Sequence, residues 1–512
     1  MNGRKVSISN TYSSVHLKNL APKRSNLKIS TCASSEKCNQ NNTGYEWCRA
    51  CNAKHFQRNF KNWTSGNANI DKFIRDTQLS ASHQQNVLEW IPYNTFYDIK
   101  YIAKGGFGQV YRANWIDGCI YKRNNKNQNW DRYSNITVAL KILNNSKDVT
   151  WEFINEIISH YKIGDNYNCY NCVTQLYGIS QDPETQNYIM VLEYAEHGSL
   201  RNYLDKCYDK LSWKDKLNNL WWISFGLAIV HVKELIHRDL HNGNILKFSS
   251  KTNITDMGLC RPAYYNKLDN KIYGVLPYIA PEILRGQNYT KATDVYSFGI
   301  IMYEVISGLP PYHDVSHDES LAIKICLGLR PRFNIKVPQL IVHLIKKCLD
   351  ANPLNRPIVN EIANILSLWY TDFDSYIELK QQIKESEEIN NKTLGNSFIS
   401  PTSSSLSYET HSEAIYTSRL LNFNNLPEPR NSGDYYNRYD DIISKEYSAS
   451  LQIDISKLKI NDDVTMKICK GLRPKSNYKI PQLIFDIISQ CWNADLLKRP
   501  NANKLLKLIH DL

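Results

Sequence analysis

The sequence predicts an α+β fold of two lobes, in which a small β-rich lobe precedes a large α-helical lobe. The first observation is composition, since 42% of the 512 residues are hydrophobic and 22% are charged, as in ordinary globular proteins. The second is order: from Trp90 to Tyr370, short strand-like runs precede long runs with helical spacing. The third is length, because no apolar run reaches the roughly 18–20 residues that span a bilayer. The longest apolar run, residues 220–232, is typical of a buried helix.

The N-terminal part holds most of the positive charge. The net charge is +12, and the first 92 residues carry 13 Lys and Arg against 5 Asp and Glu. We predict a disordered basic tail over residues 1–31, which contain no acid, and we expect no nucleic-acid site in the central domain. The N-terminus lacks the apolar core of a secretory signal, and most of the 13 cysteines are scattered. Both features predict a reduced compartment, the cytoplasm or alternatively the nucleus.

A cysteine cluster near the N-terminus predicts a small Cys-rich module over residues 32–55. The spacing is C-x₅-C-x₉-C-x₂-C, in which the second pair suits a zinc knuckle and the first pair is loose. Thiols without a metal are the alternative. The predicted zinc ligands are Cys32, Cys38, Cys48 and Cys51, with His55 as a replacement for Cys32.

Two polar or helical segments flank a central domain of residues 93–370. Residues 56–92 have apolar side chains at helical spacing and predict a helical linker. Residues 371–462 are polar and predict a largely disordered linker, with one helix near residues 376–388.

The C-terminal segment, residues 463–512, is a partial internal repeat. Residues 466–500 align without a gap to residues 323–357, with about 19 of 35 positions identical. The copy lacks the charged residues described below, so it is predicted to be non-catalytic. A gene remnant, a gene-model artefact and a helical docking piece are the alternatives for it.

The central domain opens with a glycine-rich turn, Ala103-Lys104-Gly105-Gly106-Phe107-Gly108-Gln109-Val110. Glycines let backbone N–H groups approach phosphates without a Cβ in the way. Alone, the turn is a weak signal for phosphate binding. It is followed by Lys141 at the end of an apolar strand and by Glu156, 15 residues later in a helical run. A lysine on an apolar strand needs a partner, because burying an unpaired charge is costly.

Acidic and amide residues then recur at a spacing that suits a metal–triphosphate site. His237-Arg238-Asp239-Leu240 precedes Asn244, and Asp256-Met257-Gly258 follows. Asp and Asn oxygens ligate Mg²⁺, while a separate Asp can accept a hydroxyl proton. The series is completed by Ala280-Pro281-Glu282, Asp294 and Arg356.

With these motifs in this order, the chain from about Trp90 to Tyr370 resembles a eukaryotic protein kinase domain. The resemblance implies a two-lobed kinase fold, ATP and Mg²⁺ as cofactors, protein substrates and a role in intracellular signalling. It implies that Asp239 orients the substrate hydroxyl and accepts its proton. It also implies that Lys141 holds the α- and β-phosphates and pairs with Glu156, and that Mg²⁺ is held by Asn244 and Asp256.

The resemblance assigns further residues to nucleotide binding and to bracing. Leu192 matches the gatekeeper, and Glu193 to Ala195 match the hinge that reads adenine. Glu282 and Arg356 match a buried ion pair of the large lobe. The other implied nucleotide-binding positions are Ala103, Gly105, Gly106, Gly108, Val110, Ala139 and Leu246.

The residues after Asp239 resemble the tyrosine-kinase-like branch, and other phrases resemble an expanded fungal family of such kinases. Ser/Thr kinases usually carry Lys and Thr where this chain has His241 and Val275. These Lys and Thr side chains usually contact each other, so the absence of both leaves neither one without its hydrogen-bond partner. The motifs usual in tyrosine kinases are also missing. Transfer to Ser and Thr is favoured; a tyrosine or dual-specificity kinase and a pseudokinase scaffold are the alternatives.

Two more segments depart from the usual pattern. An Asn- and Lys-rich insert around residues 121–134 predicts an exposed hairpin. The segment between Asp256 and Glu282 has no Ser or Thr, so we expect any phosphorylation there on tyrosine. Its acceptors are Tyr264, Tyr265, Tyr273 and Tyr278, of which the first three are favoured.

Overall fold

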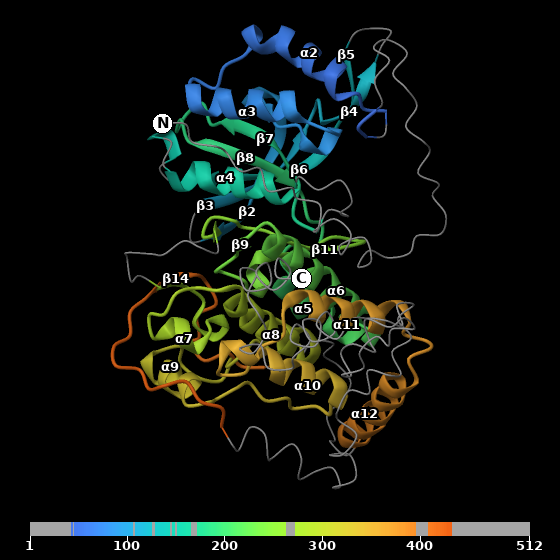
Figure 1. Cartoon of the computed structure of the whole chain (residues 1–512), viewed down its shortest axis with the longest axis vertical. Helices are drawn as coiled ribbons and strands as arrows, with labels where there is room; N and C mark the ends of the chain where they lie inside the picture. Colours follow the sequence, from blue (N-terminus) through green and yellow to red (C-terminus); the bar gives the residue numbers. More distant parts are fainter. Residues whose placement is uncertain are drawn as a thin grey trace, which may run out of the picture. The chain divides into compact units, whose positions relative to one another are not determined.

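The small lobe is built on a six-stranded sheet, as the computed structural model of the chain shows (Figure 1). Strands β6 and β8 lie inside the sheet, and their apolar, β-branched residues suit that position. The strand order is β1-β7-β8-β6-β3-β2, antiparallel throughout except for β1 against β7.

The structure describes residues 42–44, 46–105, 108–124, 129–143, 146–148, 151–164, 172–262, 272–395 and 408–432.

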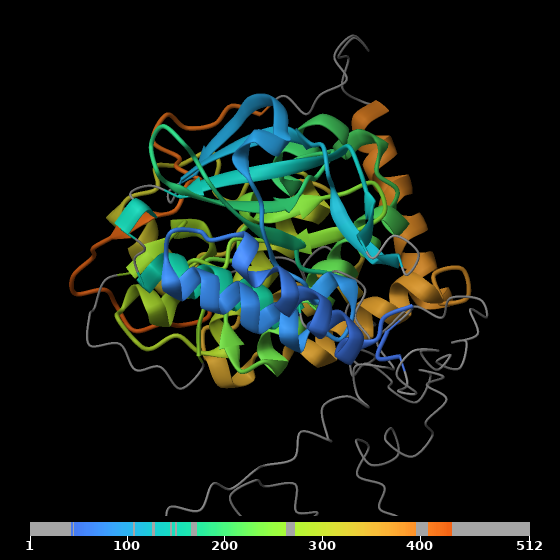
Figure 2. The ribbon, with the colours of Figure 1, turned by 90° about the horizontal axis from the view of Figure 1, so that it is seen from above.

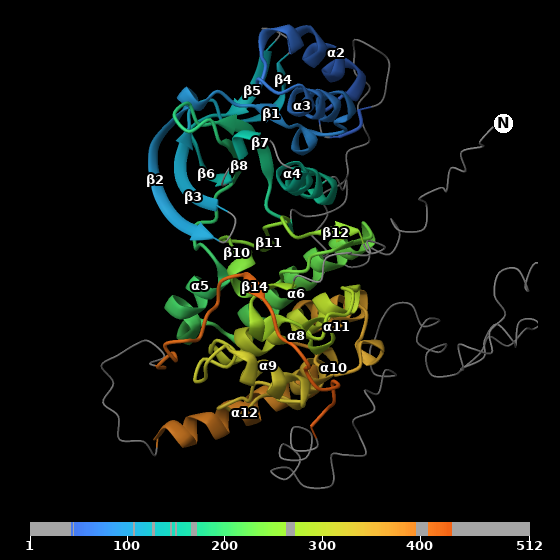
Figure 3. The same cartoon turned by 90° about the vertical axis from the view of Figure 1, so that its left-hand side faces the viewer.

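The small lobe also contains helices and a separate hairpin, and the helices lie on the side of the sheet away from β2 and β3 (Figure 3). The sheet strands are β1 (Glu89–Trp90), β2 (Phe96–Gly105), β3 (Gly108–Trp115), β6 (Ile136–Leu143), β7 (Leu176–Gln181) and β8 (Tyr188–Glu193). The hairpin strands are β4 (Cys119–Asn124) and β5 (Asn129–Tyr133). The helices are α2 (Arg49–Asn59), α3 (Ala68–Ser80) and α4 (Trp151–Gly164).

Residues 56–92, predicted as a linker, form an integral part of the small lobe. Ile70 and Ile74 of α3 are fully buried in one cluster with Phe153 and Ile157 of α4. Figures 2 and 3 show α3 lying alongside α4. Helical spacing predicts an apolar face on this segment, but it does not say what the face packs against. The linker prediction is corrected because that face has a partner within the lobe.

The insert around residues 121–134 forms the predicted hairpin, but one of its faces is covered. The ring of Trp130 stacks on Trp47 at 5.7 Å and on Phe56 of α2 at 4.5 Å, between ring centroids. Ile120 on β4 is 5% exposed. The hairpin therefore shares a small apolar core with the N-terminal extension, residues 46–92. This corrects the expectation of a fully exposed hairpin.

Replacing Trp130 with Ala should destabilise the chain by about 2–3 kcal/mol, because it removes the ring between α2 and the hairpin. Urea unfolding followed by circular dichroism measures the change. Tyr133→Ala is the matched control, since Tyr133 lies on the same strand and is 54% exposed. Its expected effect is at most about 1 kcal/mol, because the Tyr133 ring meets the partly exposed Tyr121 across the hairpin, at 4.9 Å between centroids. Equal destabilisation by the two variants would contradict the packing argument.

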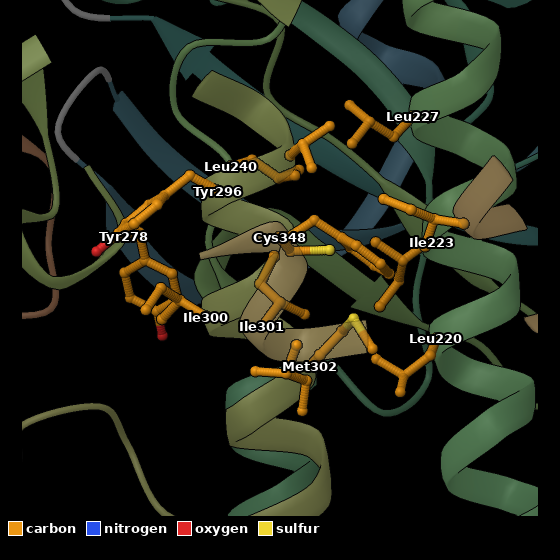
Figure 4. Packing of buried hydrophobic residues seen from close by; sticks show 14 of the residues in the cluster. Leu220, Ile223, Leu227, Leu240, Tyr278, Tyr296, Ile300, Ile301, Met302 and Cys348 are labelled. Atoms are coloured by element: carbon orange, nitrogen blue, oxygen red, sulfur yellow. The ribbon is translucent and has the colours of Figure 1, made fainter. Parts of the chain in front are cut away.

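The large lobe is helical and carries short paired strands. Its core lies between α6, α8 and α10, where Leu220, Ile223 and Leu227 of α6 meet Ile301 and Met302 of α8 (Figure 4). The helices are α5 (Leu200–Cys207), α6 (Trp213–Val232), α7 (Pro281–Leu284), α8 (Lys291–Ser307), α9 (Glu319–Cys326), α10 (Gln339–Cys348), α11 (Val359–Thr371) and α12 (Ile377–Gly395). The strand pairs are β9 (Leu235–Ile236) with β12 (Arg261–Pro262), β10 (Ile245–Lys247) with β11 (Thr252–Ile254), and β13 (Ile272–Gly274) with β14 (Arg419–Leu421).

Helix α6 contains the longest apolar run and is buried, as the sequence predicts. It begins with a capping box, in which Ser212 Oγ accepts from the Asp215 N–H at 3.2 Å. The Asp215 carboxylate accepts in return from the Ser212 N–H at 3.0 Å. Among the described residues, no helix combines the length and apolar character needed to cross a membrane.

The polar region after residue 370 is more structured than a disordered linker. The predicted helix near residues 376–388 falls within α12, which runs on to Gly395. Residues 408–432, called the tail segment below, pack on the large lobe and contribute β14. The basic tail and the C-terminal repeat lie outside the described residues.

Candidate active site

The charged centre of the site joins three elements of the fold. Lys141 on β6 places Nζ 2.7 Å from Glu156 Oε1 on α4 and 3.1 Å from Asp256 Oδ1, just after β11. The Lys141 and Glu156 side chains are 11% and 4% exposed. The structure thus brings together the lysine and glutamate that the sequence analysis paired, and it adds the second carboxylate.

These three groups set one another's ionisation. Burial opposes the charge of Lys141, but the carboxylates of Asp256 and Glu156 outweigh it and raise the pKa of the lysine. Burial raises the pKa of Glu156, and the Lys141 charge limits that rise. Burial would also raise the pKa of Asp256, yet Lys141 and a backbone N–H from Gly258 keep it below its ordinary value. Lys141 is therefore protonated and Asp256 ionised at neutral pH.

Asp294 of α8 holds the loop that carries Asp239. Its carboxylate accepts the backbone N–H groups of His237 at 2.8 Å and of Arg238 at 3.0 Å, and it lies 2.9 Å from His231 Nε2. Burial would raise the pKa of Asp294, but these hydrogen bonds and the nearby histidines lower it. Arg238 has φ of 72°, a left-handed conformation that the two anchored N–H groups stabilise. Asp294 thus fixes the backbone of the loop just before Asp239.

Asp239 is buried and is oriented by neighbours in its own loop. Asn244 Nδ2 donates to the backbone oxygen of Asp239 at 3.0 Å and to its Oδ2 at 3.2 Å. His241 Nε2 lies 3.8 Å from Asp239 Oδ1. His241, which stands where Ser/Thr kinases usually carry Lys, therefore lies beside the Asp239 carboxylate.

Most of the expected nucleotide-binding residues lie on the six-stranded sheet of the small lobe, while Leu246 lies on the separate β10–β11 pair. Gly105 pairs with Gly108 across the glycine-rich turn, and Val110 on β3 pairs with Lys141 on β6. Ala139 on β6 pairs with Leu192 on β8. The remaining positions are Ala103 on β2, Glu193 at the end of β8, Ala195 just beyond it and Leu246 on β10, while Gly106 lies outside the described residues.

Asn244 and Asp256 form a donor set that fits Mg²⁺. The Asn244 amide nitrogen faces Asp239, so its carboxamide oxygen is turned away from that carboxylate. The Thr255 N–H donates to the Asn244 backbone oxygen at 3.0 Å, which keeps the two loops adjacent. An ionised carboxylate and an amide oxygen are ligands that Mg²⁺ prefers.

The comparison with protein families decides what this arrangement is. A family model described as protein tyrosine and serine/threonine kinase matches residues 98–366, a little over half of the chain. The chain belongs to the protein kinase family. The kinase motifs expected from the sequence all fall within that matched range.

Known kinases similar to this one match it over part of their length. A "Probable serine/threonine-protein kinase" of Dictyostelium discoideum is 29% identical over 310 residues, 57% of this chain and 16% of that protein. "Probable serine/threonine-protein kinase gdt4" of the same organism is 30% identical over 275 residues, 52% of this chain and 15% of that protein. Mitogen-activated protein kinase kinase kinase 7 of Bos taurus is 30% identical over 247 residues, 46% of this chain and 42% of that protein. The chain therefore spans less than half the length of each of these relatives.

The kinase also has the buried ion pair expected in its large lobe. Arg356 donates through both terminal nitrogens to Glu282, at 2.6 and 2.8 Å. The Arg356 side chain is 0% exposed and that of Glu282 is 5% exposed. Arg356 also donates to the backbone oxygens of Asp350 and Ala292, at 2.8 and 3.0 Å. The pair links α7 to the loop before α11.

The predicted zinc ligands are only partly within the described residues of the kinase. Cys32 and Cys38 lie outside them, Cys48 precedes α2, and Cys51 and His55 lie on α2. The His55 ring meets Trp130 edge-on at 5.0 Å between centroids. Among the described residues, no group of three or more His, Cys, Asp or Glu is placed to hold a metal ion.

The activation-segment tyrosines differ in their surroundings. Tyr278 is buried and its hydroxyl donates to Glu304, so this hydroxyl is not accessible for phosphorylation. Tyr273 lies on β13 and pairs with Leu420 of β14. Tyr264 and Tyr265 lie outside the described residues.

Sequence reasoning missed one residue of this site, Ser418. Its Oγ donates to Asp239 Oδ2 at 2.6 Å and lies 3.3 Å from His241 Nε2. Ser418 belongs to the tail segment and is 179 residues from Asp239. The available signal was a group of apolar residues inside an otherwise polar region, at Ile415, Tyr416, Leu420, Leu421, Phe423 and Leu426.

Proposed function

We propose that this kinase transfers the γ-phosphate of ATP to serine and threonine hydroxyls of protein substrates. The observation that carries the proposal is the meeting of Lys141, Glu156 and Asp256 in one charged cluster. Preference for Ser and Thr is supported by the names of the relatives. A zinc-bound cysteine module and a location in the cytoplasm or nucleus are further proposals, made from the sequence alone.

Each group has one task in this reaction. Lys141, kept protonated by its two carboxylates, holds the phosphates of ATP, while Glu156 keeps the lysine in place. Mg²⁺, when bound by Asn244 and Asp256, neutralises charge on the phosphates. Asp239 accepts a hydrogen bond from the attacking hydroxyl and takes its proton. Positioning and charge neutralisation supply most of the rate in such transfers.

Phosphoamino-acid analysis tests the proposal. The purified full chain is incubated with labelled ATP, Mg²⁺ and a mixture of peptides that carry Ser, Thr or Tyr as the single acceptor. Label is expected on phosphoserine and phosphothreonine. Asp239→Asn is the control, because the amide keeps the shape of the side chain but cannot take the proton.

Three outcomes would count against it. Label confined to phosphotyrosine would replace the Ser/Thr assignment with a tyrosine kinase. Equal incorporation by Asp239→Asn would remove Asp239 from the mechanism. No label on any peptide, from chain that binds ATP, would favour a pseudokinase scaffold.

A further inference from the structure

The tail segment places a serine hydroxyl on the residue proposed as the catalytic base. Ser418 Oγ donates to Asp239 Oδ2 at 2.6 Å, which is a short, charge-assisted hydrogen bond. Asp239 is 6% exposed, so few groups can reach this oxygen. The contact has the geometry required between a general base and the hydroxyl whose proton it accepts.

Backbone pairing holds the tail segment in register beside Asp239. Strand β14 pairs antiparallel with β13, with Arg419 opposite Gly274 and Leu421 opposite Ile272. Gly274 has φ of 147°, and a Cβ there would lie 3.4 Å from Asp239 Oδ1. Addition of a strand to an exposed edge is a common way of binding an extended peptide. Ser418 is the residue just before β14. The strand pairing therefore fixes Ser418 where the hydroxyl that receives the phosphate would lie.

Upstream of Ser418, side chains anchor the segment to the large lobe. The Tyr416 hydroxyl donates to the Pro311 backbone oxygen at 2.9 Å, and its ring meets His317 edge-on at 4.8 Å. The Ile415 N–H donates to His317 Nδ1 at 3.1 Å. These contacts come from the loop between α8 and α9.

Downstream of Ser418, apolar burial and ion pairing continue the attachment. Leu421 and Leu426 are 5% and 8% exposed, and they pack into the large-lobe core. Arg285 donates to the Leu426 backbone oxygen at 3.2 Å and to Glu428 at 2.5 Å. The Arg430 N–H donates to the Cys326 backbone oxygen at 3.0 Å. Because the residues on both sides of Ser418 are attached to the large lobe, the serine hydroxyl is held beside Asp239.

We propose that Ser418 is phosphorylated by the active site of its own chain, with the tail segment as an intramolecular substrate. The inference rests on the proposed kinase function. A pseudosubstrate would present no hydroxyl at this position, whereas Ser418 presents one that can react. Until it reacts, the segment occupies the place of other protein substrates.

The step balances with ATP as the only co-reactant. Ser418 Oγ forms a bond to the γ-phosphorus, and the bond from that phosphorus to the β,γ-bridging oxygen breaks. That oxygen leaves on ADP with the electron pair, and the hydroxyl proton passes to Asp239 Oδ2 and then to water. The product places a phosphate of charge about −1.5 to −2 beside a carboxylate. Repulsion between them favours release of the tail segment.

Phosphosite mapping on the full chain tests this inference. Phosphatase-treated protein is incubated with ATP and Mg²⁺ across a dilution series, and Ser418 occupancy is followed by mass spectrometry. Phosphate on Ser418 should approach one per chain, with a first-order rate constant independent of protein concentration. Thr417→Ala is the matched control, because Thr417 is exposed and adjacent, and it should behave as the unaltered chain. Ser418→Ala should lose this phosphate.

Peptide phosphorylation gives the second readout. In the unaltered chain and Thr417→Ala, the rate on an added serine peptide should rise about tenfold as Ser418 is modified, because like charges repel at this distance. The rate of Ser418→Ala, whatever its starting value, should show no such rise during the incubation. The same rise in Ser418→Ala would overturn the blocking role.

The two proposals fail in different ways. Peptide phosphorylation with an unmodified Ser418 would overturn the inference and leave the kinase function standing. A rate proportional to protein concentration would overturn the intramolecular step. Phosphate on neither peptide nor Ser418 would overturn both.

Discussion

Replacing Lys141 with Met should lower kcat for peptide phosphorylation by about 10²- to 10³-fold, the loss typical of removing one charge-stabilising donor. Lys141 Nζ lies between Glu156 and Asp256, at 2.7 and 3.1 Å. Met keeps the apolar stem but leaves two buried carboxylates without their cation. The pKa of Glu156, which burial already raises, should rise further, and phosphates lose their ligand. Steady-state kinetics with ATP and a serine peptide measures the effect.

Lys100→Met is the matched control for this prediction. Lys100 lies on β2 of the same sheet, is 65% exposed and pairs with Asp98 at the surface. It should retain kcat within about twofold, because exposed ion pairs contribute little. A Lys141→Met variant that kept kcat within the same range would contradict the role given to the charged cluster.

Replacing Arg356 with Ala should lower the free energy of unfolding by about 3–5 kcal/mol, because it leaves the Glu282 carboxylate buried without its partner. The backbone oxygens of Asp350 and Ala292 also lose the hydrogen bonds that Arg356 donates to them. Urea unfolding of the full chain, followed by circular dichroism, measures the change.

An exposed pair and a double variant separate charge burial from simple loss of contact. Lys72→Ala breaks a 2.5 Å ion pair to Asp76 in which the two side chains are 75% and 58% exposed. Its expected effect is within about 0.5 kcal/mol. Glu282→Leu combined with Arg356→Met should recover part of the loss, since no buried charge remains unpaired. A double variant less stable than Arg356→Ala would argue against this explanation.

Local sequence was enough to predict the parts of the site that depend on a few neighbouring residues. The glycine-rich turn, the strand with Lys141 and the Asp239 loop each need particular residue types at short spacing, so their motifs are visible in one dimension. Glu156 was predicted as the partner of Lys141 from the resemblance to protein kinases, and the position of the lysine on an apolar strand indicated that it needs some partner. The geometry agrees, with the pair at 2.7 Å.

Contacts between distant segments could not be predicted in this way. The pairing of β13 with β14 uses backbone groups, which every residue type supplies, so no side-chain motif marks it. Ser418 is an ordinary serine in a Ser- and Thr-rich region until the fold brings it to Asp239. Similarly, the apolar spacing of Ile70 and Ile74 predicts a helix but not the surface on which the helix packs.

The packing of α3 on α4 bears on the conformational equilibrium of the Lys141–Glu156 pair. If α4 swung outward to separate the two charges, it would open the apolar cluster that Phe153 and Ile157 share with Ile70 and Ile74. Exposing each such side chain costs about 1.5–3 kcal/mol, and about 5.5 kcal/mol is enough to invert a 99:1 population ratio. Two or more of these side chains would therefore hold the separated state as a rare minor conformer. Helix α3 therefore favours the paired state of Lys141 and Glu156 through the apolar cluster that separation of the pair would open.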